Sequence, residues 1–123
     1  MIIKKKMVDL PAFVAGDATT IREVLHPKNE ALPITYSLAH ASLAPGASSY
    51  PHILEKQNEL YIFLKGSGQV FIGAESSPAT AGDVVLVPAG QKQYVHNSGA
   101  EELVFLCIVD PPWTKEDEVI LED

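Results

Sequence analysis

The sequence has a single cysteine, Cys107, and no long apolar run. One cysteine cannot form a disulfide within the chain, and it cannot build a cysteine cluster around a metal ion. A membrane-spanning helix needs about 18 consecutive apolar residues, and no segment approaches that length. Charges also interrupt the apolar residues of the N-terminal MIIKKKMVDLPAFV, so we expect no signal peptide. These features predict a cytoplasmic protein with no membrane partner.

Basic residues are also scarce. The chain has 9 Lys and Arg against 16 Asp and Glu, which gives a formal net charge of −7. Such a chain repels the phosphate backbone of nucleic acids. We therefore expect no nucleic-acid partner.

Helical periodicity is absent, and short apolar segments rich in Val, Ile, Tyr and Phe take its place. Such segments, bounded by Gly, Pro and Asn, are typical of strands in an all-β barrel or sandwich. We predict strands over 34–43, 59–66, 68–73, 83–88, 93–97 and 102–109, a strand rather than a helical turn over 19–26, and a turn over 73–77. The length of 123 residues suits one domain. We expect a core barrel over about 34–109, an N-terminal strand or arm over 1–33 and a C-terminal arm over 110–123.

Two of the predicted strands are apolar on both faces. In ELYIFL, residues 59–64, and LVFLCIV, residues 103–109, apolar side chains occupy both alternating sets. One set can line the interior, and the other must be covered by a chain terminus or by another subunit. We predict a homodimer. The acidic C-terminal segment could be an arm packed on the barrel or a free recognition tail.

Two longer stretches resemble the two sequence motifs of the cupin family. PGASSYPHILEKQNELYIFLKG, residues 45–66, and GDVVLVPAGQKQYVHN, residues 82–97, carry the glycines, prolines and polar residues of these motifs at Gly46, His52, Glu59, Gly66, Gly82, Pro88, Gly90 and Asn97. The resemblance covers nearly half of the chain. It implies a double-stranded β-helix, the jelly-roll barrel of small single-domain cupins, some of which are described as mannose-6-phosphate isomerase-like.

The resemblance also implies a metal site, but this chain differs from the family's ligand pattern at two positions. The family pattern offers a divalent ion three imidazoles and one carboxylate. Leu54 stands in place of the second histidine of the first motif, and Gln93 replaces the histidine of the second. The remaining metal candidates are His52, Glu59 and Gln93, with Mn, Fe, Zn and Ni not distinguishable. His40 could add a third strong ligand if its face of the strand points inward.

Without an ion, Glu59 could instead accept a hydrogen bond from His52 or from the Gln93 amide. The candidate ligand-binding residues are His52, Leu54, Glu59, Tyr61 and Gln93, and the candidate catalytic residues are His52 and Glu59. The favoured function is a small cupin with a depleted metal site that binds a small molecule in the barrel mouth. The alternatives are a divalent-metal-dependent enzyme, similar to sugar isomerases, epimerases or dioxygenases, and metal-free acid–base catalysis by His52 and Glu59.

Overall fold

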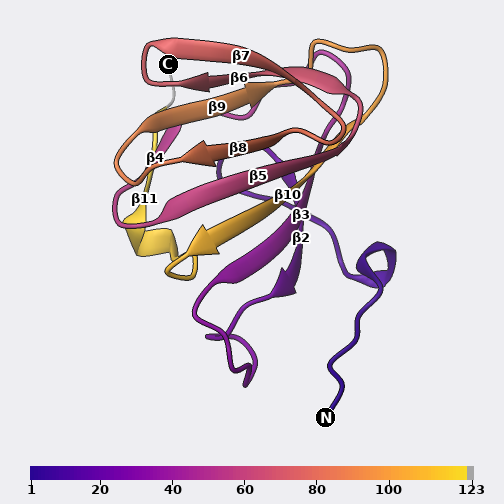
Figure 1. Ribbon diagram of the computed structural model, residues 1–123, viewed down its shortest axis with the longest axis vertical. Helices are drawn as coiled ribbons and strands as arrows, with labels where there is room; N and C mark the ends of the chain where they lie inside the picture. The colour runs from indigo at the N-terminus through magenta and orange to yellow at the C-terminus, as the bar shows by residue number, and fades with distance from the viewer. Residues whose placement is uncertain (122–123) are drawn as a thin grey trace.

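A computed structural model describes residues 1–121, which form two antiparallel sheets facing one another (Figure 1). The six-stranded sheet has the order β1-β2-β3-β10-β5-β8, and the five-stranded sheet has the order β11-β4-β9-β6-β7. The strands are β1 (Phe13–Val14), β2 (Thr20–Leu25), β3 (Ser37–Leu43), β4 (His52–Leu54), β5 (Asn58–Lys65), β6 (Ser67–Ile72), β7 (Glu75–Thr80), β8 (Val84–Val87), β9 (Lys92–His96), β10 (Leu103–Asp110) and β11 (Glu118–Ile120). This is the predicted jelly-roll fold.

Two short 3-10 turns, η1 (Met7–Asp9) and η2 (Lys115–Asp117), are the helical segments among residues 1–121. Neither is long and apolar enough to cross a membrane.

The alternation of side chains along β5 and β10 builds the core. On β5 the buried positions are Glu59, Tyr61 and Phe63, and the residues between them face outward. β10 pairs with β5 and buries Phe105 and Cys107 on the same side. The rings of Tyr61, Phe63 and Phe105 lie within 6.2 Å of one another, centroid to centroid. Because Glu59 shares the inward face with these rings, the pleat places a carboxyl group in an apolar interior.

The strand predicted over 19–26 is confirmed as β2, but the turn predicted over 73–77 is wrong from Glu75 onward. Residues 75–80 form β7, an edge strand whose one partner among the strands of residues 1–121 is β6. Most of its side chains are exposed, and Pro78 lies within it. An edge strand tolerates proline and polar residues because one side of its backbone makes no sheet hydrogen bonds.

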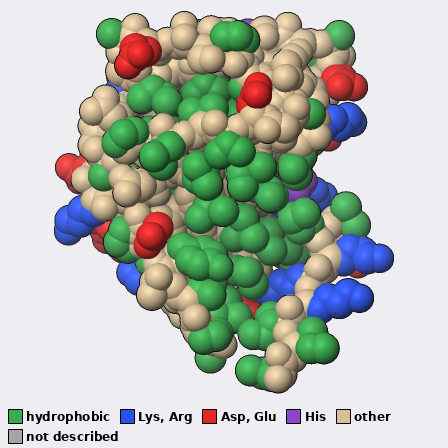
Figure 2. Space-filling view, viewed as in Figure 1, with side chains coloured by type: hydrophobic (Ala, Val, Ile, Leu, Met, Phe, Trp, Pro, Cys, Tyr) green, Lys and Arg blue, Asp and Glu red, His purple; other side chains and the backbone are tan. Residues whose placement is uncertain are grey.

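The outer face of the six-stranded sheet is apolar. The paired residues Leu60 and Leu86, and Ile62 and Val84, lie on this face, and Val84 and Leu86 are each 60% exposed. Figure 2 shows hydrophobic side chains gathered over the region where Figure 1 draws β5, β8 and β10. A homodimer that covers this face stays a prediction.

Strands near both termini pack on the barrel. β1 pairs with β2 at the edge of one sheet, and β11 pairs with β4 at the edge of the other. Nearer the N-terminus, the Lys5 ammonium donates to the carbonyl of Val24 and contacts Glu30. The two ends thereby bring residues from outside the motif region to the mouth of the barrel.

Candidate functional site

A cavity of about 120 Å³ lies between the two sheets. Its wall is mostly apolar and is formed by inward-facing side chains that include Ile21, Ala39, Leu54, Val95, Phe105 and Val109. The polar groups at the cavity include Asp17, His52, Glu59, Tyr61, Cys107 and Glu118. A mostly apolar cavity with a few converging polar groups is the usual composition of a small-molecule site.

His52 enters the cavity from β4, and its side chain is only 4% exposed. Nδ1 lies 2.9 Å from the backbone oxygen of Tyr50. Because a carbonyl oxygen only accepts hydrogen bonds, Nδ1 carries the proton. Nε2 lies 3.8 Å from Oδ2 of Asp17, too far for a hydrogen bond. In the neutral ring, the lone pair of Nε2 is therefore available at the cavity.

Glu59 enters the same cavity from β5. Burial raises its pKa from 4.5 to about 7, an effect that His52 partly offsets and that the charge of Asp17 reinforces. The neighbouring Cys107 thiol also lowers the pKa of Glu59 in part. Near neutral pH both forms of Glu59 are populated, so this group can donate or accept a proton in the cavity.

Tyr61 follows Glu59 on the inward face of β5 and donates a hydrogen bond to Oε1 of Gln93. Burial and the charge of Glu59 raise the pKa of Tyr61 well above its usual value, so the phenol keeps its proton. Gln93 is 1% exposed, and its position on β9 pairs with His52 on β4. The fold thus brings His52, Glu59 and Gln93 into one region, but the amide oxygen of Gln93 is already engaged.

The motif positions do not supply the ligand set of the family. Leu54 lies inward beside the cavity and has no donor atom. Gln93 directs its oxygen to Tyr61. A metal site built from the motif residues alone would therefore rest on His52 and Glu59, and catalytic zinc sites usually keep three protein ligands.

Asp17 approaches His52 from the loop between β1 and β2. Its Oδ1 accepts a hydrogen bond of 3.0 Å from the backbone N–H of Thr19, and its carbonyl oxygen accepts one of 2.7 Å from the N–H of Tyr50. The first bond fixes the carboxylate within its turn. The second ties the loop to the residue whose carbonyl orients His52. Oδ2 is thereby directed toward Nε2 of His52.

Glu118 approaches from β11. It pairs with Leu54 in the register that also pairs Ile120 with His52. Directly opposed residues of an antiparallel pair share a face, so Glu118 lies inward beside the position where the motif lacks its histidine. Burial raises the pKa of Glu118, with His52 opposing the shift and Asp17 adding to it. One ligand-type atom each of Asp17, His52 and Glu118 lies within 4.8 Å of the others.

Asp17 and Glu118 lie outside the two motifs, so the sequence did not indicate them as site residues. A weak signal existed for Glu118, which follows Trp113 and precedes the Val-Ile-Leu triplet of a segment with apolar anchors. An acidic residue between such anchors becomes a candidate site residue only once the segment is known to pack on the barrel.

The other histidines lie away from this group. His40 on β3 pairs with Leu106 and Arg22, on the face opposite to the buried Ala41. Because the inward face of β3 carries Ala41 and not His40, the fold does not bring His40 to His52. His96 on β9 contacts the Ser48 hydroxyl at 2.5 Å.

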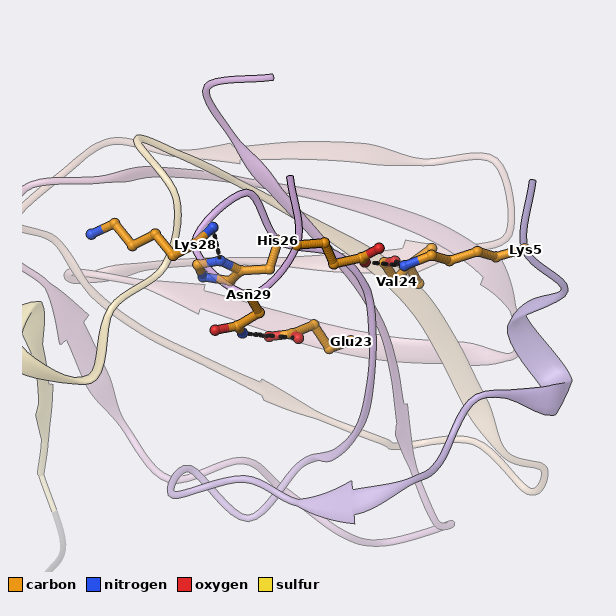
Figure 3. A network of polar contacts seen from close by, with 7 residues as sticks. Lys5, Glu23, Val24, His26, Lys28 and Asn29 are labelled. Atoms are coloured by element: carbon orange, nitrogen blue, oxygen red, sulfur yellow. Dashed lines mark hydrogen bonds and ion pairs between the residues drawn. The ribbon is translucent and has the colours of Figure 1, made fainter. Parts of the chain in front are cut away.

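His26 directly follows β2, and its side chain is buried beside the cavity. Its Nδ1 accepts a hydrogen bond of 3.2 Å from the N–H of Lys28 (Figure 3). Nε2 then donates to the carbonyl of Trp113 at 2.7 Å. With both nitrogens engaged, His26 joins the end of β2 to the C-terminal segment.

Comparisons with known proteins show which family the fold and the motifs belong to. Residues 39–109 match the sequence model of the cupin domain. An uncharacterized protein of Methanocaldococcus jannaschii is 31% identical over 121 residues, 98% of this chain and 96% of that protein. An oxalate-binding protein of Thermotoga maritima is 32% identical over 71 residues, 58% of this chain and 59% of that protein.

Among solved structures, a predicted oxalate decarboxylase from Thermotoga maritima superposes with a TM-score of 0.78 at 22% identity, over 90% of this chain and 99% of that one. At this identity the likeness shows the fold alone. The domain match spans more than half of the sequence and includes both motifs. The chain therefore belongs to the cupin family.

Proposed function

We propose that the protein binds a small organic molecule in the barrel cavity, with its apolar part against the wall and a hydrogen-bonding group at the polar end. The observation that carries this proposal is the cavity of about 120 Å³. A single buried water needs roughly 10–15 Å³ of such space. The cavity therefore has room for a small ligand.

The polar end offers complementary hydrogen-bonding groups. Among residues 1–121, Nε2 of His52 has no hydrogen-bond partner, and it can accept a hydrogen bond when the ring is neutral. Glu59 donates as an acid and accepts as a carboxylate, since its pKa is about 7. A hydroxyl or amine group on a ligand would find partners in both residues.

The charges at the cavity favour some ligands over others. Its lining includes Asp17, Glu59 and Glu118, and among the described lining residues there is no Lys or Arg. Free anions are therefore poor ligands, because they would meet carboxylates in a low-dielectric space. The oxalate-binding relative suggests a small dicarboxylate, but such an anion would need a cation beside it in this chain. We expect neutral and cationic molecules to bind better than free anions.

Three probes of nearly equal size test this proposal: n-propanol, n-propylammonium and propionate. Each is titrated into the isotopically labelled protein, in the presence of chelator, while the amide resonances of Ser49 and Cys107, which line the cavity, are followed by NMR. We expect saturable shifts with the neutral and cationic probes and weaker shifts with propionate. Absence of saturable shifts with all three would contradict the proposal.

A pair of variants locates the binding. Ala39→Phe adds a ring at the cavity wall, whereas Ser76→Phe adds the same ring on the exposed edge strand β7. The first substitution should abolish the shifts and the second should leave them unchanged. Equal loss in both variants would contradict binding inside the cavity.

A second candidate is a divalent-metal-dependent enzyme of the isomerase, epimerase or dioxygenase type. The observation that favours it is the group of ligand-type atoms from Asp17, His52 and Glu118 within 4.8 Å. An ion of Mn, Fe, Zn or Ni held there would supply Lewis-acid chemistry to a bound substrate. Glu59 would hold or release a proton at its carboxyl group. The lack of Lys and Arg in the described lining disfavours sugar phosphates as substrates.

The variant His52→Ala separates the two candidates. A binding protein should still bind n-propanol saturably but more weakly, because the apolar wall and Glu59 remain while one hydrogen-bonding partner is lost. An enzyme should lose turnover in a screen of unphosphorylated sugars and small hydroxy acids. Turnover that survives the substitution would exclude both the metal-dependent reaction and metal-free acid–base catalysis by His52 and Glu59.

A further inference from the structure

We propose that Asp17, His52 and Glu118 form a divalent-cation site that replaces the ligand set of the cupin motifs with an oxygen-rich one. The proposal rests on the cavity being the functional site, although the ion does not require the organic ligand to be bound. Two carboxylates from the chain ends would take the place of the imidazoles absent at Leu54 and Gln93. The remaining coordination positions would face the cavity.

The spacing of the ligand atoms fits an ion. Nε2 of His52 and Oδ2 of Asp17 are 3.8 Å apart, and all three ligand atoms lie within 4.8 Å. Two ligands that each lie about 2.1 Å from a common ion are separated by roughly 3.0 to 4.2 Å, depending on the angle between them. The group therefore needs only small side-chain adjustments to close around one ion.

His52 provides an observation independent of the acidic groups. Its side chain is 4% exposed, and within the described part of the chain Nε2 has no hydrogen-bond partner, while Oδ2 of Asp17 lies 3.8 Å away. The other ring nitrogen is fixed by the carbonyl of Tyr50 at 2.9 Å. Histidine ligands in metal sites usually show this arrangement, in which a backbone carbonyl sets the tautomer and the ring orientation.

The negative charges of the carboxylates at the cavity also favour a bound cation. One ligand atom each of Asp17, His52 and Glu118 lies within 4.8 Å of the others. The described residues that line the cavity also include Glu59, but no Lys or Arg. Buried charges in proteins are normally paired or coordinate a metal ion. A divalent ion would neutralise the carboxylates of Asp17 and Glu118, for which the described residues supply no Lys or Arg partner.

The ligand set indicates the class of ion. One imidazole and two carboxylates offer more oxygen than nitrogen, which suits ions such as Mn²⁺ that accept carboxylates and keep bound waters. Such an ion would also explain how an anion could enter a cavity lined by acidic residues. A small carboxylate could bind directly to its open positions.

Both carboxylates are held by the folded chain ends. The turn at Asp17 is fixed by the N–H groups of Thr19 and Tyr50. β11 is held by its pairing with β4, and Asp117 accepts hydrogen bonds from Gln57 at 2.7 Å and Thr114 at 2.6 Å. The two outer ligands are therefore positioned before any ion binds, which lowers the entropy cost of binding.

Titration of metal-free protein with Mn²⁺ tests the site, with free Mn²⁺ measured by electron paramagnetic resonance. We expect one ion per chain. Asp17→Asn and Glu118→Gln keep the side-chain shape and remove one charge, so each should weaken binding roughly tenfold or more. Glu23→Gln is the matched control, since Glu23 also lines the cavity but lies outside the group. It should leave the affinity unchanged.

The parent protein provides a readout that does not depend on the variants. Bound Mn²⁺ should broaden the NMR resonances of Ser49 and His52 before those of Ser76 on the far edge strand. Thermal unfolding in chelator then checks that the two neutralised variants fold.

Three outcomes are decisive. Absence of stoichiometric binding, or binding that neither substitution weakens, would overturn the cation site. If Mn²⁺ fails to bind while n-propanol still shifts the cavity resonances, the cation site is refuted and the ligand-binding proposal stands. If Mn²⁺ binds at these residues but no organic probe does, the cation site stands and the ligand-binding proposal is refuted.

Discussion

Replacing Glu59 by glutamine tests the energetic cost of placing a carboxyl group in the apolar interior. Burial raises the pKa of Glu59 from 4.5 to about 7, so the folded chain binds this proton more tightly than the unfolded chain does. Between pH 4.5 and about pH 7, Glu59 is protonated in a larger fraction of folded than of unfolded molecules. Stability therefore falls as the pH rises through this window.

The size of the effect follows from the pKa difference. At 1.36 kcal/mol per pKa unit, the shift from 4.5 to about 7 corresponds to a loss of about 3 kcal/mol, complete above pH 7. Glutamine has nearly the same shape and does not titrate. The variant Glu59→Gln should therefore gain about 3 kcal/mol of stability relative to the parent between pH 4 and pH 8.

Urea denaturation of both proteins from pH 4 to pH 8 measures this difference. The protein concentration is held fixed so that any self-association contributes equally, and chelator prevents a bound ion from altering the titration. Glu118, whose pKa is also raised by burial, titrates in both proteins. A stability difference that stays flat across the pH range would refute the reasoning.

Three further substitutions test the motif positions and the backbone around the site. Leu54→His places an imidazole at a position that is 2% exposed. We expect it to lower the stability of the metal-free protein by about 2–4 kcal/mol and to raise the affinity for Zn²⁺ roughly tenfold. Unfolding with and without Zn²⁺ measures both effects. Asn97→Ala removes three hydrogen bonds of 2.9 Å at a fully buried side chain and should cost about 2–4 kcal/mol in urea denaturation. Gly66→Ala puts a Cβ 2.7 Å from the Glu102 carbonyl at a φ of +85° and should cost about 2–3 kcal/mol. Parent-like unfolding midpoints in the last two variants would contradict the packing described for them.

The strands of the barrel could be predicted because local alternation specifies them. Tyr61 and Phe63 on β5 and Phe105 on β10 recur with a period of two, and turn residues bound each strand. β7 escaped prediction because its polar, proline-containing sequence lacks an apolar face. Its place in the sheet depends on the free edge of β6, which is a property of the assembled fold.

The candidate site was predicted only in part. His52 and Glu59 stand in the motif and do reach the cavity. Gln93 lies beside His52, but its bond to Tyr61 depends on the rotamers of two buried side chains from different sheets. This hydrogen bond depends on tertiary packing, so it could not be predicted from the spacing of residues in the sequence.

The sequence by itself determined the barrel and the loss of two imidazoles, because periodic side chains and motif spacing are local properties. Only the tertiary structure decided which acidic groups lie beside His52. Asp17 and Glu118 lie 101 positions apart in the numbering of the chain, and they meet at His52 because both chain ends pack at the barrel mouth. Contacts between such distant segments follow from closure of the two sheets around a common core.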